Sequence, residues 1–387
     1  MSAGEASGDL YAATLVDTLR RRRPDVEFFG CAGPRMQRAG VRPVVDAASL
    51  SVVGLAEVLG HIPRIYGEFR RMCRAAAAGR PAAAVLTDSP DFHLRLAAEL
   101  HRLGIPVIYL VAPQAWAWRK GRVRNLRRNV KRLLCIFPFE EEFFSKQGVP
   151  AEYIGHPLAR LVRPSQPGSA FRARHSLESG RPLVTVLPGS RPGEVARHLP
   201  ELKAAAGRIL AKDMQVALAA PGGFSEAAGK DFFERRALPR AVRVIEGETW
   251  DAIAHADIAL AASGTVTIET ALLGTPMVTF YRVTPLTWLV GRPLVRVPFY
   301  SMVNLVAQRR VVPELIQNEM TGERLATEVF RLWDDQGARE RMQRDLAEVA
   351  GRLRDGCEPM ERAADIVEDL LLESGAAAGP GEGAACS

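Results

Sequence analysis

The chain has 387 residues, more than a single hydrophobic core usually supports, so two domains are expected. Hydrophobic residues make up 47% of the chain and charged residues 25%, proportions that exclude a disordered or a fibrous protein. The formal net charge of +7 suits phosphate groups or anionic surfaces, but it does not distinguish nucleic acid, lipid and nucleotide partners. The five cysteines form no C-x-x-C pair, so neither a disulfide framework nor a zinc site is predicted, and a reducing cytosol fits best.

The first half of the chain alternates short apolar runs with segments that carry helix or turn signals. This alternation is typical of the βαβ units of a parallel sheet. No apolar run reaches the roughly 20 residues that a membrane-spanning helix needs. The predicted strands of this half cover residues 26–30, 82–87, 106–111 and 132–137.

The second half repeats the pattern, with predicted strands at 183–187, 214–219, 242–245, 258–262 and 276–280. The proline-spaced residues 157–168 between the halves are typical of a linker and predict one domain over 1–160 and another over 161–340. From Thr321 onward the apolar residues follow helical spacing. The Gly- and Ala-rich residues 374–387 predict a disordered tail.

The start of the chain lacks one element of a doubly wound domain. Such a domain normally has a buried apolar strand directly before its first glycine-containing turn, yet only three residues precede Gly4. We therefore expect further strand-forming residues upstream of Met1 in the natural protein.

Residues 4–9, Gly-Glu-Ala-Ser-Gly-Asp, open the first predicted helix. Glycines let the backbone approach a ligand closely, and the N–H groups at a helix start attract oxygen or phosphate. The motif is therefore a candidate ligand-binding site, since a glutamate between the two glycines is not required for capping. The alternative is that Ser7 or Asp9 only caps the helix.

Asp88, Asp91 and His93 come directly after a predicted strand, at the edge where open α/β sheets place their chemistry. A carboxylate at this edge suits a general base. Helix capping, with Pro90 in the first turn, explains one of the two carboxylates but not both. His93 considered alone is more typical of a structural residue.

Two motifs follow strands of the second half. Residues 187–191, Leu-Pro-Gly-Ser-Arg, bring backbone donors, a hydroxyl and a guanidinium together, which suits a diphosphate, although an ordinary Pro-Gly turn is the alternative. Residues 263–265, Ser-Gly-Thr, are followed by Glu269 among apolar neighbours. That carboxylate would accept hydrogen bonds from a ribose diol or else form a salt bridge.

A strongly basic run begins at two tryptophans. Aromatic residues beside arginines suit an anionic membrane surface. Nucleic acid would use the same charges, but no nucleic-acid recognition motif accompanies them. The predicted membrane-facing residues are Trp116, Trp118, Arg119, Lys120, Arg122 and Arg124.

The order of these motifs resembles that of the lipid-A-disaccharide synthase family, from about residue 3 to residue 370. The most specific parts are residues 4–9 and the Trp-Ala-Trp-Arg block at 116–119. The resemblance implies a GT-B fold of the α/β class, in which two Rossmann-like doubly wound domains face a cleft and the C-terminal helices, over 341–373, return to the first domain. The family usually has Asn where this chain has His93. The other matching segments are 33–36, 88–92, 113–115, 137–140, 154–157, 187–191 and 263–265.

The resemblance also implies a reaction. An inverting glycosyltransferase would join UDP-2,3-diacylglucosamine to 2,3-diacylglucosamine 1-phosphate, forming the β-1,6-linked lipid A disaccharide precursor and releasing UDP. The first domain would bind the acceptor and the inner-membrane surface, and the second the UDP-sugar. The protein would then be cytoplasmic and peripheral on the inner face of the inner membrane. The UDP-sugar would be a substrate, and no cofactor, metal or nucleic acid is implied.

The resemblance carries roles over residue by residue. Asp88 becomes the general base and Arg191 the clamp on the diphosphate, while Glu5 becomes a further catalytic residue of the first domain. The remaining expected substrate-binding residues are Ser7, Asp91, Gly189, Ser190, Ser263, Gly264, Thr265, Glu269 and Asn304.

The sequence is also compatible with three other functions. Another UDP-sugar-using enzyme of cell-envelope assembly and a UDP-sugar 2-epimerase would share the fold, but an epimerase of soluble sugars has no need of the basic aromatic segment. A regulatory protein would bind a UDP-sugar or lipid unchanged. The two carboxylates together with a diphosphate motif argue against that third function.

Overall fold

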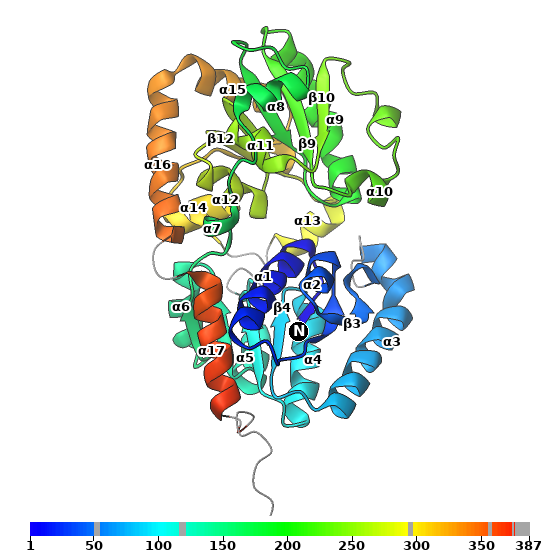
Figure 1. Ribbon diagram of the computed structural model, residues 1–387. Coiled ribbons are helices and arrows are strands. Elements are labelled where there is room, and N and C mark those ends of the chain that lie inside the picture. The colour runs from blue at the N-terminus through cyan, green and yellow to red at the C-terminus, as the bar shows by residue number, and fades with distance from the viewer. Residues whose placement is uncertain (50–54, 116–120, 293–296, 355–357, 374, 376–387) are drawn as a thin grey trace, which may run out of the picture. The chain divides into compact units, whose positions relative to one another are not determined.

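The computed structural model describes residues 1–49, 55–115, 121–292, 297–354, 358–373 and 375. The chain divides into two compact units. The first unit combines Met1–Pro157 with Asp355–Ser387, and the second is Leu158–Arg354. Each unit is built on one sheet with helices packed against it (Figure 1).

The first unit holds a parallel sheet of seven strands in the order β3-β2-β1-β4-β5-β6-β7. Its strands are β1 Ser2–Ala3, β2 Phe29–Ala32, β3 Arg42–Asp46, β4 Ala84–Thr87, β5 Val107–Leu110, β6 Arg132–Cys135 and β7 Ala151–Tyr153. Its helices are α1 Ala6–Arg22, α2 Pro34–Arg38, α3 Leu55–Gly79, α4 Pro90–Arg102, α5 Gly121–Asn129, α6 Pro138–Ser145 and α17 Pro359–Glu373.

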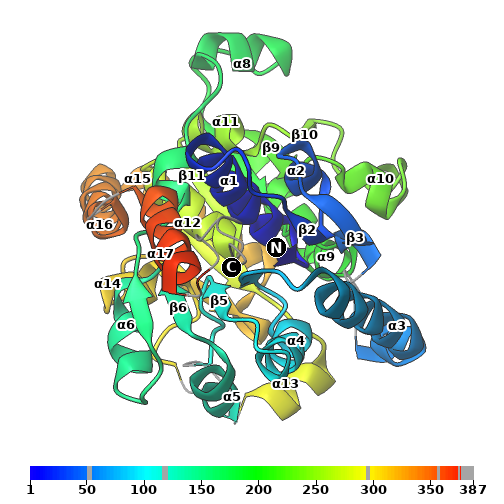
Figure 2. The same ribbon diagram turned by 60° about the horizontal axis from the view of Figure 1, so that its bottom comes forward.

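Helices cover both faces of this sheet. Helices α3, α4 and α5 pack in sequence on one face, and α1 lies beside α17 on the other (Figure 2). Every residue of β4 and β5 is therefore buried, as is typical of central strands in a parallel sheet. The predicted strand at 26–30 starts later, as β2, because the N–H of Val26 still bonds the carbonyl of Arg23 in the turn after α1.

The first strand is only two residues long. Ser2–Ala3 pairs with β2 on one side and β4 on the other, and both residues are buried. Ala3 packs with Ala12 and Val16 of α1. The position between β2 and β4, for which the sequence offered no apolar run, is thus occupied by β1.

The second unit holds a parallel sheet of six strands in the order β10-β9-β8-β11-β12-β13. Its strands are β8 Leu183–Leu187, β9 Gln215–Ala220, β10 Val242–Glu246, β11 Ile258–Ala262, β12 Met277–Tyr281 and β13 Glu314–Ile316. Its helices are α7 Leu158–Leu161, α8 Gly168–Arg174, α9 Pro192–Leu210, α10 Phe224–Ala228, α11 Thr249–Ala254, α12 Thr265–Leu272, α13 Pro285–Gly291, α14 Met302–Ala307, α15 Gly322–Asp334 and α16 Gln336–Arg354.

The C-terminal helices expected over 341–373 divide between the units. Helix α16 belongs to the second unit, where it packs on α12 and α14, and α17 belongs to the first unit, where it packs on α1. In the described ranges, no helix is both long enough and apolar enough to cross a bilayer.

Both sheets have a point at which the strand order reverses, between β1 and β4 in the first unit and between β8 and β11 in the second. Open α/β sheets bind ligands at such points, beyond the carboxyl ends of the strands. The loops that follow β1, β4, β8 and β11 are therefore where the chemistry is expected.

Candidate active site

Asp88 follows β4 at the reversal point of the first sheet. The backbone φ angle is +58° at Asp88 and +37° at Ser89, in the left-handed region that non-glycine residues rarely adopt. The turn directs the carboxylate at the start of α1. There the N–H of Gly4 donates to Oδ1 at 2.8 Å and the N–H of Glu5 donates to Oδ2 at 3.0 Å. The carboxylate thus lies at the positive end of the helix dipole.

Burial raises the pKa of Asp88 to about 7, and the charge of Glu5 adds to the rise. The N–H donors of Gly4 and Glu5 favour the charged form and oppose that rise. Only 12% of the Asp88 side chain is exposed. A carboxyl group with a pKa near neutrality is suited to accept a proton at physiological pH, as a general base must.

The close contact between the start of α1 and the turn at Asp88 requires glycine at positions 4 and 8. A Cβ atom at Gly8 would lie 1.7 Å from Asp88 Oδ2, and one at Gly4 would lie 2.3 Å from Ser89 Oγ. The interpretation of Ser7 or Asp9 as the cap of α1 is wrong, because α1 begins after Glu5. Asp9 instead accepts the N–H groups of Arg35 and Met36 at 2.9 and 3.1 Å, at the start of α2. Glu5 is exposed and Ser7 half-buried.

The second carboxylate of the motif has a different environment. Asp91 Oδ1 accepts a hydrogen bond from Arg122 at 2.9 Å, which joins α4 to α5. The Arg122 side chain is only 9% exposed, so the prediction that it faces a membrane is wrong. Arg124 on the same helix is exposed. Trp116, Trp118, Arg119 and Lys120 lie outside the described residues.

In the second unit, residues 188–191 connect β8 to α9. Gly189 has a φ of +119°, and a Cβ atom there would lie 2.5 Å from Glu194 Oε2. The same oxygen accepts the N–H of Ser190 at 3.2 Å. Burial and the charge of Glu194 raise the pKa of Tyr281 to about 12, so the phenol stays a donor. Glu194, which the sequence analysis did not select, therefore braces this loop.

His198 is a second support of the loop that sequence reasoning missed. It is fully buried, and its Nδ1 lies 2.9 Å from the carbonyl oxygen of Pro188. The N–H of Arg282 donates to Nε2 at 3.1 Å, so Nδ1 carries the proton and donates to Pro188. Burial lowers the pKa of His198 and keeps the ring neutral. A single histidine at mid-helix gave no signal for this role.

Residues 263–265 lie beside this loop because β8 and β11 are neighbouring strands. Helix α12 begins at Thr265, and both Thr265 and Gly264 are exposed. Ser263 donates its hydroxyl to the carbonyl oxygen of Tyr300 at 2.8 Å. Glu269 is half-buried, one turn further along α12. The second sheet thus brings together at one edge the residues expected to bind a nucleotide.

Asn304 does not fit the role that the resemblance implied. Its side chain is fully buried. Its Oδ1 accepts the N–H groups of Val311 and Val312 at 2.7 and 2.9 Å, and its Nδ2 donates to the carbonyl of Val312 and to Glu314 at 3.0 and 2.9 Å. These four bonds use the donors and acceptors of the amide within the unit, so Asn304 organises the loop before β13 and is not available to a substrate.

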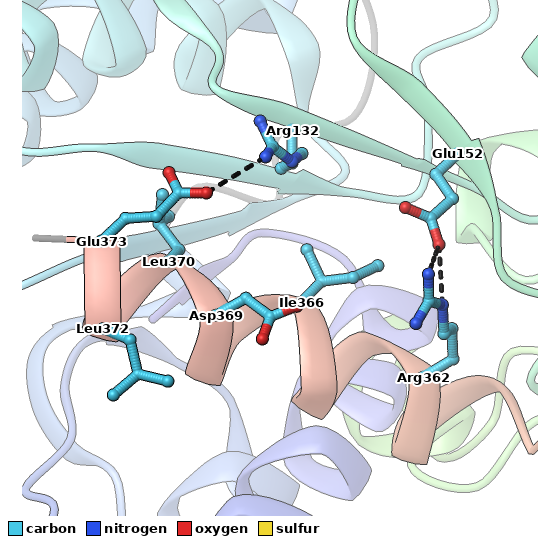
Figure 3. Close-up of a pocket in the computed structure, with 8 residues that line it drawn as sticks. All are labelled: Arg132, Glu152, Arg362, Ile366, Asp369, Leu370, Leu372 and Glu373. Atoms are coloured by element: carbon cyan, nitrogen blue, oxygen red, sulfur yellow. Dashed lines mark hydrogen bonds and ion pairs between the residues drawn. The ribbon is translucent and has the colours of Figure 1, made fainter.

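Two cavities of the first unit lie away from Asp88. One, of about 360 Å³, is lined mainly by α17, β6 and β7, and in it Arg132 pairs with Glu373 at 3.4 Å and Arg362 donates to Glu152 at 2.7 Å (Figure 3). The other, of about 700 Å³, lies where β4, β5 and β6 begin. Since open α/β sheets place their chemistry at the opposite ends of the strands, neither cavity is the candidate site. In the described part of the chain, no three His, Cys, Asp or Glu side chains are grouped to hold a metal ion.

Two parallel α/β units with polar loops at both reversal points define a protein of the GT-B class, and solved structures support this class. The UDP-GlcNAc 2-epimerase of Neisseria meningitidis superposes with a TM-score of 0.63 at 12% identity, covering 96% of this chain and 98% of that one. A calicheamicin glycosyltransferase gives 0.54 at 18% identity, covering 96% of each chain. At these identities the similarity concerns the fold alone.

The sequence comparisons are more specific. A family profile described as lipid-A-disaccharide synthetase matches residues 1–366. The lipid-A-disaccharide synthase of Solibacter usitatus is 60% identical over 371 residues, which is 96% of this chain and 97% of that protein. The enzyme of the same name from Myxococcus xanthus is 45% identical, covering 95% and 96%. The chain belongs to the lipid-A-disaccharide synthase family and is a glycosyltransferase, which confirms the resemblance and the GT-B fold.

Proposed function

We propose that this chain is an inverting glycosyltransferase that joins UDP-2,3-diacylglucosamine to the 6-hydroxyl of 2,3-diacylglucosamine 1-phosphate, forming the β-1,6-linked lipid A disaccharide precursor and releasing UDP. Family membership supports the substrates. The observation that carries the mechanism is the buried Asp88 carboxyl, whose pKa of about 7 suits proton removal from a hydroxyl.

The proposed step is a single displacement. The 6-hydroxyl oxygen of the acceptor forms a bond to C1 of the donor sugar, while the bond from C1 to the diphosphate oxygen breaks and that oxygen keeps the electron pair. The hydroxyl proton passes to Asp88. Arg191 and the backbone N–H groups of Gly189 and Arg191 stabilise the charge on the departing UDP. One displacement inverts the configuration at C1.

The other proposed contacts follow the division into units. Glu5, exposed beside Asp88, and Ser7 contact the acceptor in this proposal. Ser190, Ser263, Gly264, Thr265 and Glu269 hold the nucleotide. The UDP-sugar is consumed as a substrate, and the reaction needs no cofactor or metal ion, so transfer in the presence of EDTA is expected to match transfer without it.

We also propose that the protein works on the cytoplasmic face of the inner membrane, because both proposed substrates carry acyl chains. The exposed arginines of α5, with Arg124 among them, support an attraction to anionic headgroups.

The test is radiolabelled sugar transfer with purified protein and both diacylated substrates, alongside calorimetric titration with UDP. Asp88→Asn is expected to lower kcat by about 10²- to 10⁴-fold and to leave UDP affinity unchanged, since only the proton acceptor is lost. Arg191→Ala is expected to weaken both UDP binding and turnover, because a diphosphate clamp acts before and during bond cleavage. Asp17→Asn, on an exposed position of α1, is the matched control and should behave like the parent.

Undiminished transfer by Asp88→Asn would exclude this residue as the base. Parent-like UDP binding by Arg191→Ala would place the clamp elsewhere. Formation of a 2-epimer from UDP-GlcNAc without any acceptor would support the epimerase alternative in place of the proposed function.

A further inference from the structure

The backbone carbonyl of Asp88 accepts two hydrogen bonds from buried side chains that have no part in the proposed displacement. The hydroxyl of Tyr109, on β5, donates to this oxygen at 2.6 Å. The Nδ1 of His93, in the first turn of α4, lies 2.9 Å from the same oxygen. Both side chains are fully buried.

These contacts determine which nitrogen of His93 carries the proton. A carbonyl oxygen only accepts, so Nδ1 must be the protonated nitrogen. Nε2 is then the acceptor, and the Ser2 hydroxyl lies 2.7 Å from it. Burial lowers the pKa of His93 to about 4 and raises that of Tyr109, so both groups remain neutral donors around pH 7.

Aromatic side chains keep the imidazole in place. Phe92 meets His93 edge to face with ring centroids 5.3 Å apart, and Phe69 of α3 meets Phe92 in the same way at 5.9 Å. The imidazole is therefore held by packing as well as by its two hydrogen bonds.

The turn that these donors hold is energetically costly. A left-handed backbone is unfavourable for a non-glycine residue because its Cβ atom crowds the backbone, and here Asp88 and Ser89 adopt this conformation in succession. Such strain persists only where the surroundings enforce it. Because the carboxylate reaches the N–H groups of Gly4 and Glu5 from this turn, its aim depends on the backbone conformation at residue 88.

We propose that His93 and Tyr109 are positioning residues, which clamp the Asp88 carbonyl and so keep the carboxylate directed at the start of α1. The proposal rests on the proposed function, in which Asp88 is the general base. It gives a buried histidine a role through Asp88 rather than through contact with a substrate.

The chain offers matched variants for the test. Tyr109→Phe removes only the hydroxyl oxygen. His93→Asn keeps an N–H donor on an atom bonded to Cγ, the position of Nδ1, whereas His93→Leu puts carbon there. We expect kcat to fall about 10- to 100-fold in Tyr109→Phe and in His93→Leu with KM nearly unchanged, and to stay near the parent value in His93→Asn.

Titration of the Asp88 carboxyl distinguishes a positioning role of His93 and Tyr109 from an effect on folding stability alone. The titratable groups that face Asp88 are Glu5, Cys31, His93 and Tyr109, and the Met1 amino group, with a pKa lowered by burial to about 6, faces His93. The ¹³C carboxyl signal of Asp88, assigned by its loss in Asp88→Asn, reports this group alone. Its midpoint is expected near 7 in the parent and in His93→Asn. The midpoint should move by about half a unit or more in Tyr109→Phe and in His93→Leu. Loss of the N–H donors of Gly4 and Glu5 raises the pKa of Asp88, whereas loss of burial lowers it.

Parent-like kcat and midpoint in folded Tyr109→Phe and His93→Leu would overturn the proposal. So would a His93→Asn variant as impaired as His93→Leu. If His93→Leu does not fold, the kcat and the Asp88 titration midpoint of Tyr109→Phe provide the test. Failure of the proposed function is recognised separately, because Asp88→Asn would then keep its turnover while the carboxyl titration still shows whether the clamp holds Asp88.

Discussion

A single carboxyl group shows how its environment shifts the pKa of a common residue. Asp88 carries an ordinary side chain, and what distinguishes it is burial opposed by two backbone donors, with the carbonyl of the same residue clamped from the other side. The sequence predicted a carboxylate at a strand end. The pKa of that carboxylate depends in part on Gly4 and Glu5, which are more than eighty positions away in the sequence.

The raised pKa of Asp88 predicts how the stability of the protein depends on pH. The pKa is 3.8 unperturbed and about 7 in the folded protein, so between these values the folded state binds more protons than the unfolded state. The stabilising contribution is complete below 3.8 and is lost as pH rises through 7. Relative to the parent, Asp88→Asn should gain on the order of 2 kcal/mol of unfolding free energy between about pH 5 and pH 8.

Urea denaturation of both proteins at these two pH values measures this difference. An identical pH dependence would contradict the assignment. If Asp88 is the base, as the proposed function has it, kcat needs its deprotonated form and should rise as pH passes through about 7.

Gly8→Ala tests the close approach between α1 and Asp88. Helix propensity alone predicts a gain in stability, but the new Cβ atom would lie 1.7 Å from Asp88 Oδ2 and must displace the carboxylate. We expect a loss of about 10²-fold in kcat. Gly67→Ala, in α3 with open space around the added atom, is the control and should keep its kcat. Equal activity of the two variants would contradict the contact.

At the scale of elements, the strands that the sequence hid are short or lie at sheet edges, although one edge strand, β10, was predicted. Central strands such as β4 and β8 are buried on both faces and read as continuous apolar runs. The unpredicted strands β3, β7 and β13 lie at sheet edges and include charged residues such as Arg42, Glu152 and Glu314. Strand β1 has only two residues, too few to carry any periodicity.

A charged contact joins α17 to α1 in the first unit, in addition to the buried apolar residues of α17. Arg22 donates to Asp365 at 2.7 Å and to Glu368 at 2.9 Å and also bonds Glu361, while 29% of its side chain is exposed. These carboxylates are one turn apart along α17, so one guanidinium spans two turns of the helix.

Arg22→Met should loosen α17, since it keeps the apolar stem and removes the charge. We expect a loss of about 1 kcal/mol, discounted for solvent screening, and faster amide hydrogen exchange along α17. High salt should reduce the difference from the parent. Arg102→Met, which breaks an exposed pair with Glu99, is the control and should leave exchange in α17 unchanged. Parent-like exchange in Arg22→Met would show that apolar packing alone holds the helix.

At the scale of the whole molecule, 51 basic residues exceed 44 acidic ones, and the exposed basic side chains of α5 include Arg124, Arg127 and Arg128. Replacing these three by Gln should weaken sedimentation with anionic vesicles at low salt, at about 1 kcal/mol for each charge removed. Binding of the parent should also disappear at high salt.

The control for vesicle binding removes the same charge from the second unit. Lys203, Arg208 and Lys212 are exposed on α9 and in the turn that follows it, and their replacement by Gln should leave most binding intact. Equal losses in the two triple variants would mean that net charge, rather than α5, drives the attraction.

The sequence by itself determined the class of protein and the loops that matter, because apolar runs and the residues that follow them are local properties of the chain. Only the tertiary structure decided what those residues do. In the folded protein, Asp88 is hydrogen-bonded by Gly4, His93 and Tyr109. Arg122 is buried and bonds Asp91, and the side-chain amide of Asn304 is hydrogen-bonded within its own unit. Burial and hydrogen-bond partners depend on which strands are neighbours in the sheet, and these contacts between distant residues carry no local pattern.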